Sequence, residues 1–87
     1  MDESQKIVAK IVESLRKARE EKGISRYRIA KETGLSPSGI RHMENGEVTP
    51  TLYFLLRISA FLEIDLADCI TKAVSKRHKP QSPKLPK

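Results

Sequence analysis

Three polar side chains that can hydrogen-bond to nucleic-acid bases lie within one five-residue stretch, at Ser38, Arg41 and His42. Arginine can donate to O6 and N7 of guanine, serine can donate or accept with several bases, and histidine can donate to guanine N7. Positions three and four apart share one face of a helix, and Pro37 would stand at its start. The pattern favours base recognition in a major groove; the alternative is a solvated helix surface.

Other chemistry has little support in the sequence. There is no credible Ser-His-Asp arrangement, no metal-ligand cluster and no glycine loop for phosphates, so we expect no catalytic residue, no metal and no cofactor. The single Cys69 excludes a disulfide framework and is expected to be a core residue. The polar start MDESQK is not typical of a signal peptide, and no apolar run approaches the roughly 18 residues of a membrane span. We therefore expect a cytoplasmic, nucleoid-associated protein without membrane contact.

The positive charge is unevenly distributed. The chain of 87 residues has a formal net charge of +6, but residues 76–87 carry five Lys and Arg and no acid, which leaves +1 for residues 1–75. These last residues also hold three prolines, so we expect a basic, disordered tail after one domain at 1–75. The tail could add phosphate attraction or be merely solubilising. DNA binding by the domain must depend on local placement of charge.

Apolar residues recur at spacings of three and four, which predicts helices and no strand. The expected helices cover residues 4–22, 26–33, 37–44 and 52–62, and a fifth follows Asp65. Ser4, Ser25, Ser36, Thr51 and Asp65 are the expected N-caps. In the fourth helix the inner face is expected to comprise Leu52, Leu55, Ile58 and Leu62.

The two short helices at 26–33 and 37–44 are joined by a tight turn with Gly34 at its centre. This is the helix-turn-helix layout, in which the second helix enters the major groove of DNA. Ala30 is small where the two helices approach, and Ile40 is expected to point into the core.

The run GISRYRIAKETGLSPSGIRHMENGEVTPTLYFLLRISAFLEID resembles the lambda-repressor/Cro-like (XRE) helix-turn-helix family. Its markers are Ile29-Ala30, Gly34-Leu35-Ser36, Ile40, Glu44-Asn45-Gly46, Pro50 and Leu62. The resemblance implies an all-α, five-helix domain and a sequence-specific DNA-binding regulator that is often dimeric on palindromic operators.

The same resemblance implies roles for further residues. Arg19 and Glu44 fall where the family often places an interior ion pair, although an exposed pair is the alternative. Arg26, at the start of the second helix, falls where a phosphate is contacted, and free backbone N–H groups there favour an anion. Further candidate phosphate ligands are Ser36, Arg28, Asn45 and Thr49. Asn45 is equally well explained as a turn residue.

Three departures from the family pattern stand out. Gly39 lowers helix propensity in the predicted recognition helix by about 1 kcal/mol relative to Ala. Glu47 puts an acid where many members carry a base facing phosphates. Glu63 replaces a common glycine, so a left-handed backbone there would be strained by about 1 kcal/mol.

We expect a transcriptional regulator, most simply a repressor, that binds double-stranded DNA as a homodimer through Phe61, Leu66 and Ile70. The apolar residues beyond one inner stripe of the fourth helix could instead cover its neighbours. The alternative function is an antitoxin or an adaptor that uses the same fold to bind a protein partner, such as a toxin or co-regulator, through the tail or the Tyr53-Phe54 surface.

Overall fold

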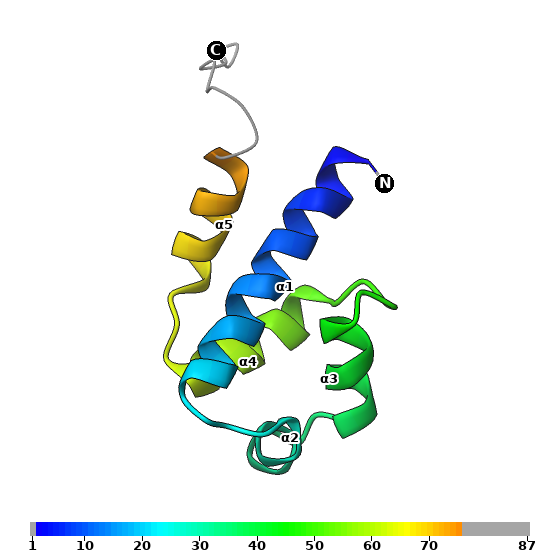
Figure 1. Ribbon diagram of the computed structural model, residues 1–87, viewed down its shortest axis with the longest axis vertical. Coiled ribbons are helices and arrows are strands. Elements are labelled where there is room, and N and C mark those ends of the chain that lie inside the picture. The colour runs from blue at the N-terminus through cyan, green and yellow to red at the C-terminus, as the bar shows by residue number, and fades with distance from the viewer. Residues whose placement is uncertain (1, 76–87) are drawn as a thin grey trace.

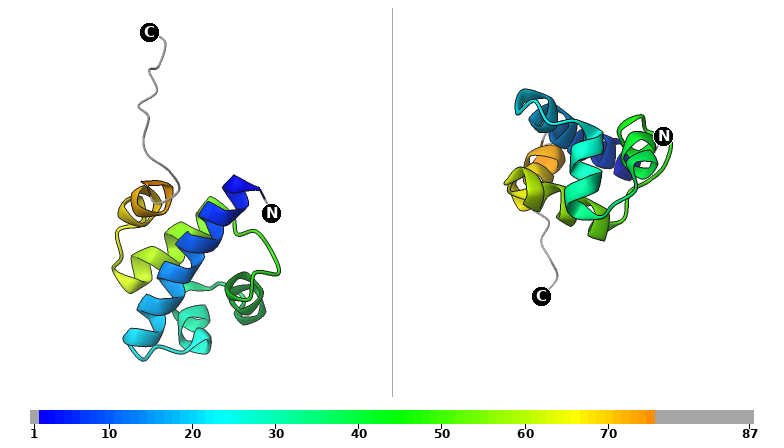
Figure 2. Two further views of the ribbon diagram at one scale, coloured as in Figure 1. Left: turned by 45° about the horizontal axis from the view of Figure 1, so that its top comes forward. Right: turned by 90° about the horizontal axis from the view of Figure 1, so that it is seen from below.

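The computed structural model describes residues 2–75, which form five α-helices and no strand (Figure 1). The predicted basic tail at 76–87 lies outside the described residues. The helices are α1 (Glu3–Glu21), α2 (Arg26–Thr33), α3 (Pro37–Glu44), α4 (Leu52–Leu62) and α5 (Leu66–Ser75). The long α1 packs on α3, α4 and α5, while α2 bridges α3 and α4 (Figure 2). The predicted all-α, five-helix fold is confirmed.

The first helix begins earlier than its sequence suggested. Asp2, not Ser4, is the N-cap: its Oδ1 accepts a 2.7 Å hydrogen bond from the backbone N–H of Gln5. The Gln5 Oε1 in turn accepts a bond from the Asp2 N–H at 2.9 Å. This reciprocal capping box satisfies two N–H groups that the helix cannot, so Ser4 lies inside the helix instead.

One aliphatic core joins all five helices, as the apolar spacing predicted. It comprises Ile11, Val12, Leu15, Ile29, Ala30, Ile40, Met43, Leu55, Ile58, Leu62, Leu66 and Ala73. Leu52 was wrongly expected here and is 61% exposed. As the first residue of α4, it lies beyond the end of the buried stripe that Leu55 begins.

The link between α4 and α5 turns through a left-handed residue. Glu63 has φ 60° and ψ 42°, and it is the one described non-glycine residue with positive φ. The Ile64 N–H then donates to the Ser59 carbonyl at 2.8 Å, and Asp65 Oδ1 accepts from the Asp68 N–H at 3.3 Å. These bonds stop one helix and start the next, so that α5 folds back onto α1.

Candidate nucleic-acid interface

The turn between α2 and α3 is fixed by its own residues. Gly34 ends α2 with φ +80°, a backbone conformation that costs glycine little. The buried Thr33 hydroxyl donates to the Ile29 carbonyl at 2.7 Å and accepts from the Leu35 N–H at 3.2 Å. Ser36 then caps α3 by accepting from the Gly39 N–H at 3.0 Å, with Pro37 at the first helical position. The angle between α2 and α3 is therefore set locally.

Burial of one face of α3 decides which side chains face outward. Ile40 and Met43 are almost completely buried. Pro37, Ser38 and Arg41 are exposed, and His42 is partly exposed. The four residues predicted to meet base edges thus remain accessible, on a short helix whose opposite side is anchored in the core.

His42 is held by an acid from the loop that follows α3. Its Nδ1 lies 2.5 Å from Oε1 of Glu47, and the Glu47 N–H donates to the His42 carbonyl at 2.9 Å. The hydrogen bond from His42 lowers the pKa of the Glu47 carboxyl below its ordinary value, although desolvation opposes it, and the charges of His42 and Arg41 and the Asn45 side chain lower it further. Glu47 is thus an ionised acid beside the outward face of α3.

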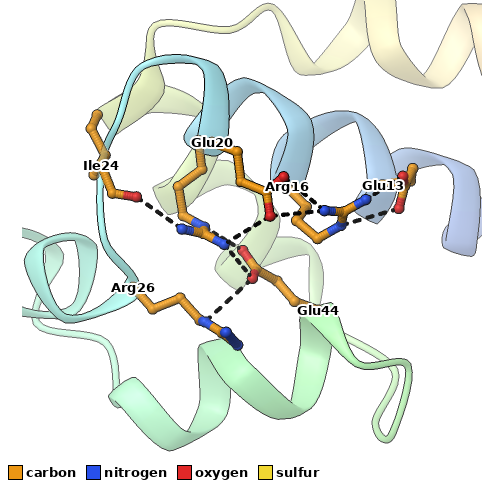
Figure 3. A network of polar contacts seen from close by, with 7 residues as sticks. Glu13, Arg16, Glu20, Ile24, Arg26 and Glu44 are labelled. Carbon is orange, nitrogen blue, oxygen red and sulfur yellow. Dashed lines mark hydrogen bonds and ion pairs between the residues drawn. The ribbon is translucent and has the colours of Figure 1, made fainter.

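A chain of alternating charges ties α1 to α2 and α3 (Figure 3). At its centre Arg19 donates to both carboxylate oxygens of Glu44, at 2.8 and 3.0 Å, and to the Ile24 carbonyl at 2.9 Å. The side chains of Arg19 and Glu44 are only 10% and 5% exposed. Arg26 of α2 approaches the same carboxylate, with its Nε 3.6 Å from Oε1. The interior pair expected from the family resemblance is therefore present in the structure, with Arg26 as an additional cation.

The candidate phosphate ligands differ in how free they are. Arg26 is partly buried and lies near Glu44, and Ser36 uses its hydroxyl oxygen to cap α3. Asn45 and Thr49 are exposed on the segment that follows α3. Arg28 instead lies over the ring of Phe61 in α4, 6.0 Å from its centroid. Arg28 thus has a cation–π contact within the fold while the residue itself stays exposed.

Comparison with protein families matches the helix-turn-helix family model to residues 15–69, which include α2, the turn and α3. The chain belongs to the helix-turn-helix family. Its domain is of the lambda-repressor/Cro-like (XRE) type, a family of DNA-binding regulators rather than of enzymes. Neither the curated proteins nor the solved structures include a match.

Three further findings concern membrane spans, metal ligands and the cysteine of this helix-turn-helix domain. None of the described helices is long and apolar enough to cross a membrane. Over residues 2–75, no three His, Cys, Asp or Glu side chains gather as metal ligands would. The thiol of Cys69 packs against the core, and burial raises its pKa, which keeps it protonated.

The residues expected to pair two copies of the domain are only partly available. Leu66 was a wrong choice for a surface contact because it is 7% exposed and belongs to the core. Phe61 packs against that core beneath Arg28. Ile70 alone retains appreciable exposure. Periodicity could not separate these residues, since the apolar stripe on α5 is wider than the face that α1 and α4 cover.

Two contacts around the helix-turn-helix could not be predicted from the sequence. Arg57 of α4 donates to the carbonyl of Thr33, at the last turn of α2, across 24 positions of chain. It also lies 5.9 Å from the centroid of the Tyr53 ring. Glu47 reaches His42 only because the chain reverses at Gly46, whose φ is +77°. Both contacts depend on how the elements meet in space.

Proposed function

We propose that this domain is a sequence-specific transcriptional regulator that binds operator DNA as a homodimer, most simply a repressor that occludes polymerase. The observation that carries the proposal is the division of α3 into two faces. Ile40 and Met43 are buried while Ser38 and Arg41 are exposed beside a partly exposed His42. A helix of this kind can enter the major groove without breaking the core contacts of its buried face.

In the proposed complex, α3 reads base edges and its surroundings hold phosphates. Arg41 donates to guanine O6 and N7, Ser38 supplies a hydroxyl at the first turn, and Pro37 offers an apolar contact. Arg26 stays close enough to its partner Glu44 to orient its guanidinium, and its half-exposed side chain can donate to a phosphate. Asn45 and Thr49 add contacts beyond the other end of α3.

A homodimer would place two recognition helices one DNA turn apart, at roughly 34–36 Å. Exposed aliphatic side chains on the two C-terminal helices support it: Leu52 and Leu56 four residues apart on α4, and Ile70 and Val74 four apart on α5. Each pair shares one face of its helix. We propose these four side chains as the pairing surface. Of the three residues expected from the sequence, it retains Ile70.

The function is tested by gel-shift titration with duplex from the gene's own promoter and with random duplex. Wild type should prefer the promoter, and Arg41→Ala should weaken that binding by about 5- to 150-fold, as for loss of a bidentate base contact. Lys72→Ala removes the same charge from α5, which does not contact α2 or α3, and should bind as wild type does. Equal effects of the two substitutions would contradict base reading by Arg41.

A protein-binding role, as an antitoxin or adaptor, has one observation in its favour. Leu52, Tyr53 and Leu56 leave a partly apolar patch exposed on α4. Of the predicted Tyr53-Phe54 surface only Tyr53 is open, because Phe54 packs against the core. If the full chain binds no duplex even at low salt, this second function replaces the first.

A further inference from the structure

His42 can contribute to base recognition either as a hydrogen-bond donor or as an acceptor, and its surroundings decide which. In a neutral imidazole one ring nitrogen carries a proton and donates, while the other accepts. The hydrogen bond made by one nitrogen fixes the role of the other. The contact between Nδ1 of His42 and Oε1 of Glu47, at 2.5 Å, therefore determines whether Nε2 donates or accepts.

An ionised carboxylate only accepts hydrogen bonds, so the proton of this contact resides on Nδ1. Glu47 is ionised because His42, Asn45 and Arg41 all favour its charged form. In the neutral ring, Nε2 is then left with a free lone pair. It becomes an acceptor on a partly exposed side chain of the recognition helix.

We propose that Glu47 is a specificity-determining positioning residue, which presents Nε2 of His42 to DNA as an acceptor for the amino group of adenine or cytosine. The inference rests on the proposed function, because it requires that α3 reads base edges. In the major groove only adenine N6 and cytosine N4 are amino donors, whereas guanine offers acceptors. The expectation from residue type alone, donation by His42 to guanine N7, is thereby revised for the neutral ring.

A backbone hydrogen bond also joins the two residues. The Glu47 N–H donates to the His42 carbonyl at 2.9 Å, which keeps the backbone of Glu47 beside the residue that its carboxylate contacts. Asn45 and Arg41 also favour the charged form of the same carboxylate and so lower its pKa. The acid thus has a defined partner even though its own side chain is largely exposed.

Two substitutions of Glu47 separate orientation from charge. In Glu47→Gln the amide oxygen can still accept from Nδ1–H but the negative charge is gone, whereas Glu47→Ala removes both. Asp68→Asn on α5 is the matched control, since it removes one acid from a helix that does not contact α2 or α3.

The experiment is selection of preferred sites from a randomised duplex library by the full chain, at a mildly alkaline pH that keeps imidazole neutral. Wild type, Glu47→Gln and Asp68→Asn should prefer adenine or cytosine at the position where His42→Ala loses its preference. Glu47→Ala should lose or change the preference at that position only. Nitrogen-15 NMR of the His42 ring should show the proton on Nδ1 in wild type, and its redistribution to Nε2 in Glu47→Ala.

Three results would overturn the proposal: an unchanged base preference in Glu47→Ala, a uniform change over all positions of the site, or a wild-type ring protonated on Nε2. The failure of the proposed function looks different. A wild-type chain with no sequence preference rejects operator binding itself, whereas a preference that Glu47→Ala leaves intact rejects only the role of Glu47.

Discussion

The ring of Phe54 in α4 lies against Gly39 in α3, so closely that a Cβ added to the glycine would stand 3.2 Å from Cζ of the ring. Gly39 has an ordinary helical backbone rather than a positive φ. Its value to the domain is therefore space for the aromatic ring, by which a long side chain of α4 reaches α3.

This contact predicts that substitutions at the two positions are coupled. Gly39→Ala should gain helix propensity worth about 1 kcal/mol, but in the wild-type background displacement of the Phe54 ring offsets part of that gain. In a Phe54→Leu background the ring tip is absent and the full gain should appear. Urea unfolding of the four proteins in a double-mutant cycle measures the coupling, and strict additivity would show that the ring does not limit position 39.

Removal of one partner of the buried ion pair should be costly. Arg19→Met leaves the Glu44 carboxylate shielded from water, which predicts a loss of about 3 kcal/mol, at the lower end of the usual range because Arg26 lies nearby. Arg16→Met is the control: Arg16 pairs with Glu13 and Glu20 on the exposed side of the same network, so its loss should be much smaller. Denaturant unfolding would contradict the burial argument if the two losses were equal.

A substitution at the left-handed residue Glu63 should raise the stability of the domain. Glu63→Gly relieves the strain of a side chain at φ 60°, about 1 kcal/mol, and after the extra entropy of glycine in the unfolded chain we expect a net gain of up to about 0.5 kcal/mol. Glu63→Ala keeps a Cβ and should leave stability nearly unchanged. Thermal unfolding of both variants checks the prediction; a stabilised alanine variant would point to charge instead of backbone strain.

The lowered pKa of Glu47 gives a prediction for pH dependence. A carboxyl whose pKa is lower in the folded than in the unfolded state stabilises the fold above the unfolded value, and that contribution disappears as the pH falls through the folded value. In His42→Ala the Glu47 pKa should rise toward its ordinary value, because the largest cause of its depression is removed. Carbon-13 NMR titration of the carboxyl carbons measures this change. The pKa of Glu13, lowered by Arg16, should stay where it is and serves as the internal control.

Much of the fold followed from local rules. Ser25, Ser36 and Thr51 cap α2, α3 and α4 as predicted, because an N-cap needs only a hydroxyl three residues before an unpaired N–H. The helix-turn-helix layout likewise predicted that Ile40 of α3 points into the core, where it is fully buried. The spacing of apolar residues wrongly predicted that Leu52 is buried. Leu52 lies at the first turn of α4, and periodicity does not show where a helix extends beyond the helices packed against it.

The candidate site was predictable in its residue types but not in its pairings. The outward face of α3 follows from helical spacing once Ile40 is inside. Glu47, in contrast, read as an unfavourable acid near phosphates, and only the path of the chain at Gly46 brings it to His42. Gly39 was expected only to weaken the helix. Its packing role could not be predicted, because the ring that fills the space beside it comes from another helix.

The shielding of the pair formed by Arg19 and Glu44 has a practical consequence for handling the protein. Mobile ions weaken exposed charge contacts strongly but reach buried ones far less. Concentrated salt should therefore strip nucleic acid from a purified sample while the helices stay assembled. The loss of DNA during such a wash would report on the interface alone, and dilution back to low salt should restore binding without a refolding step.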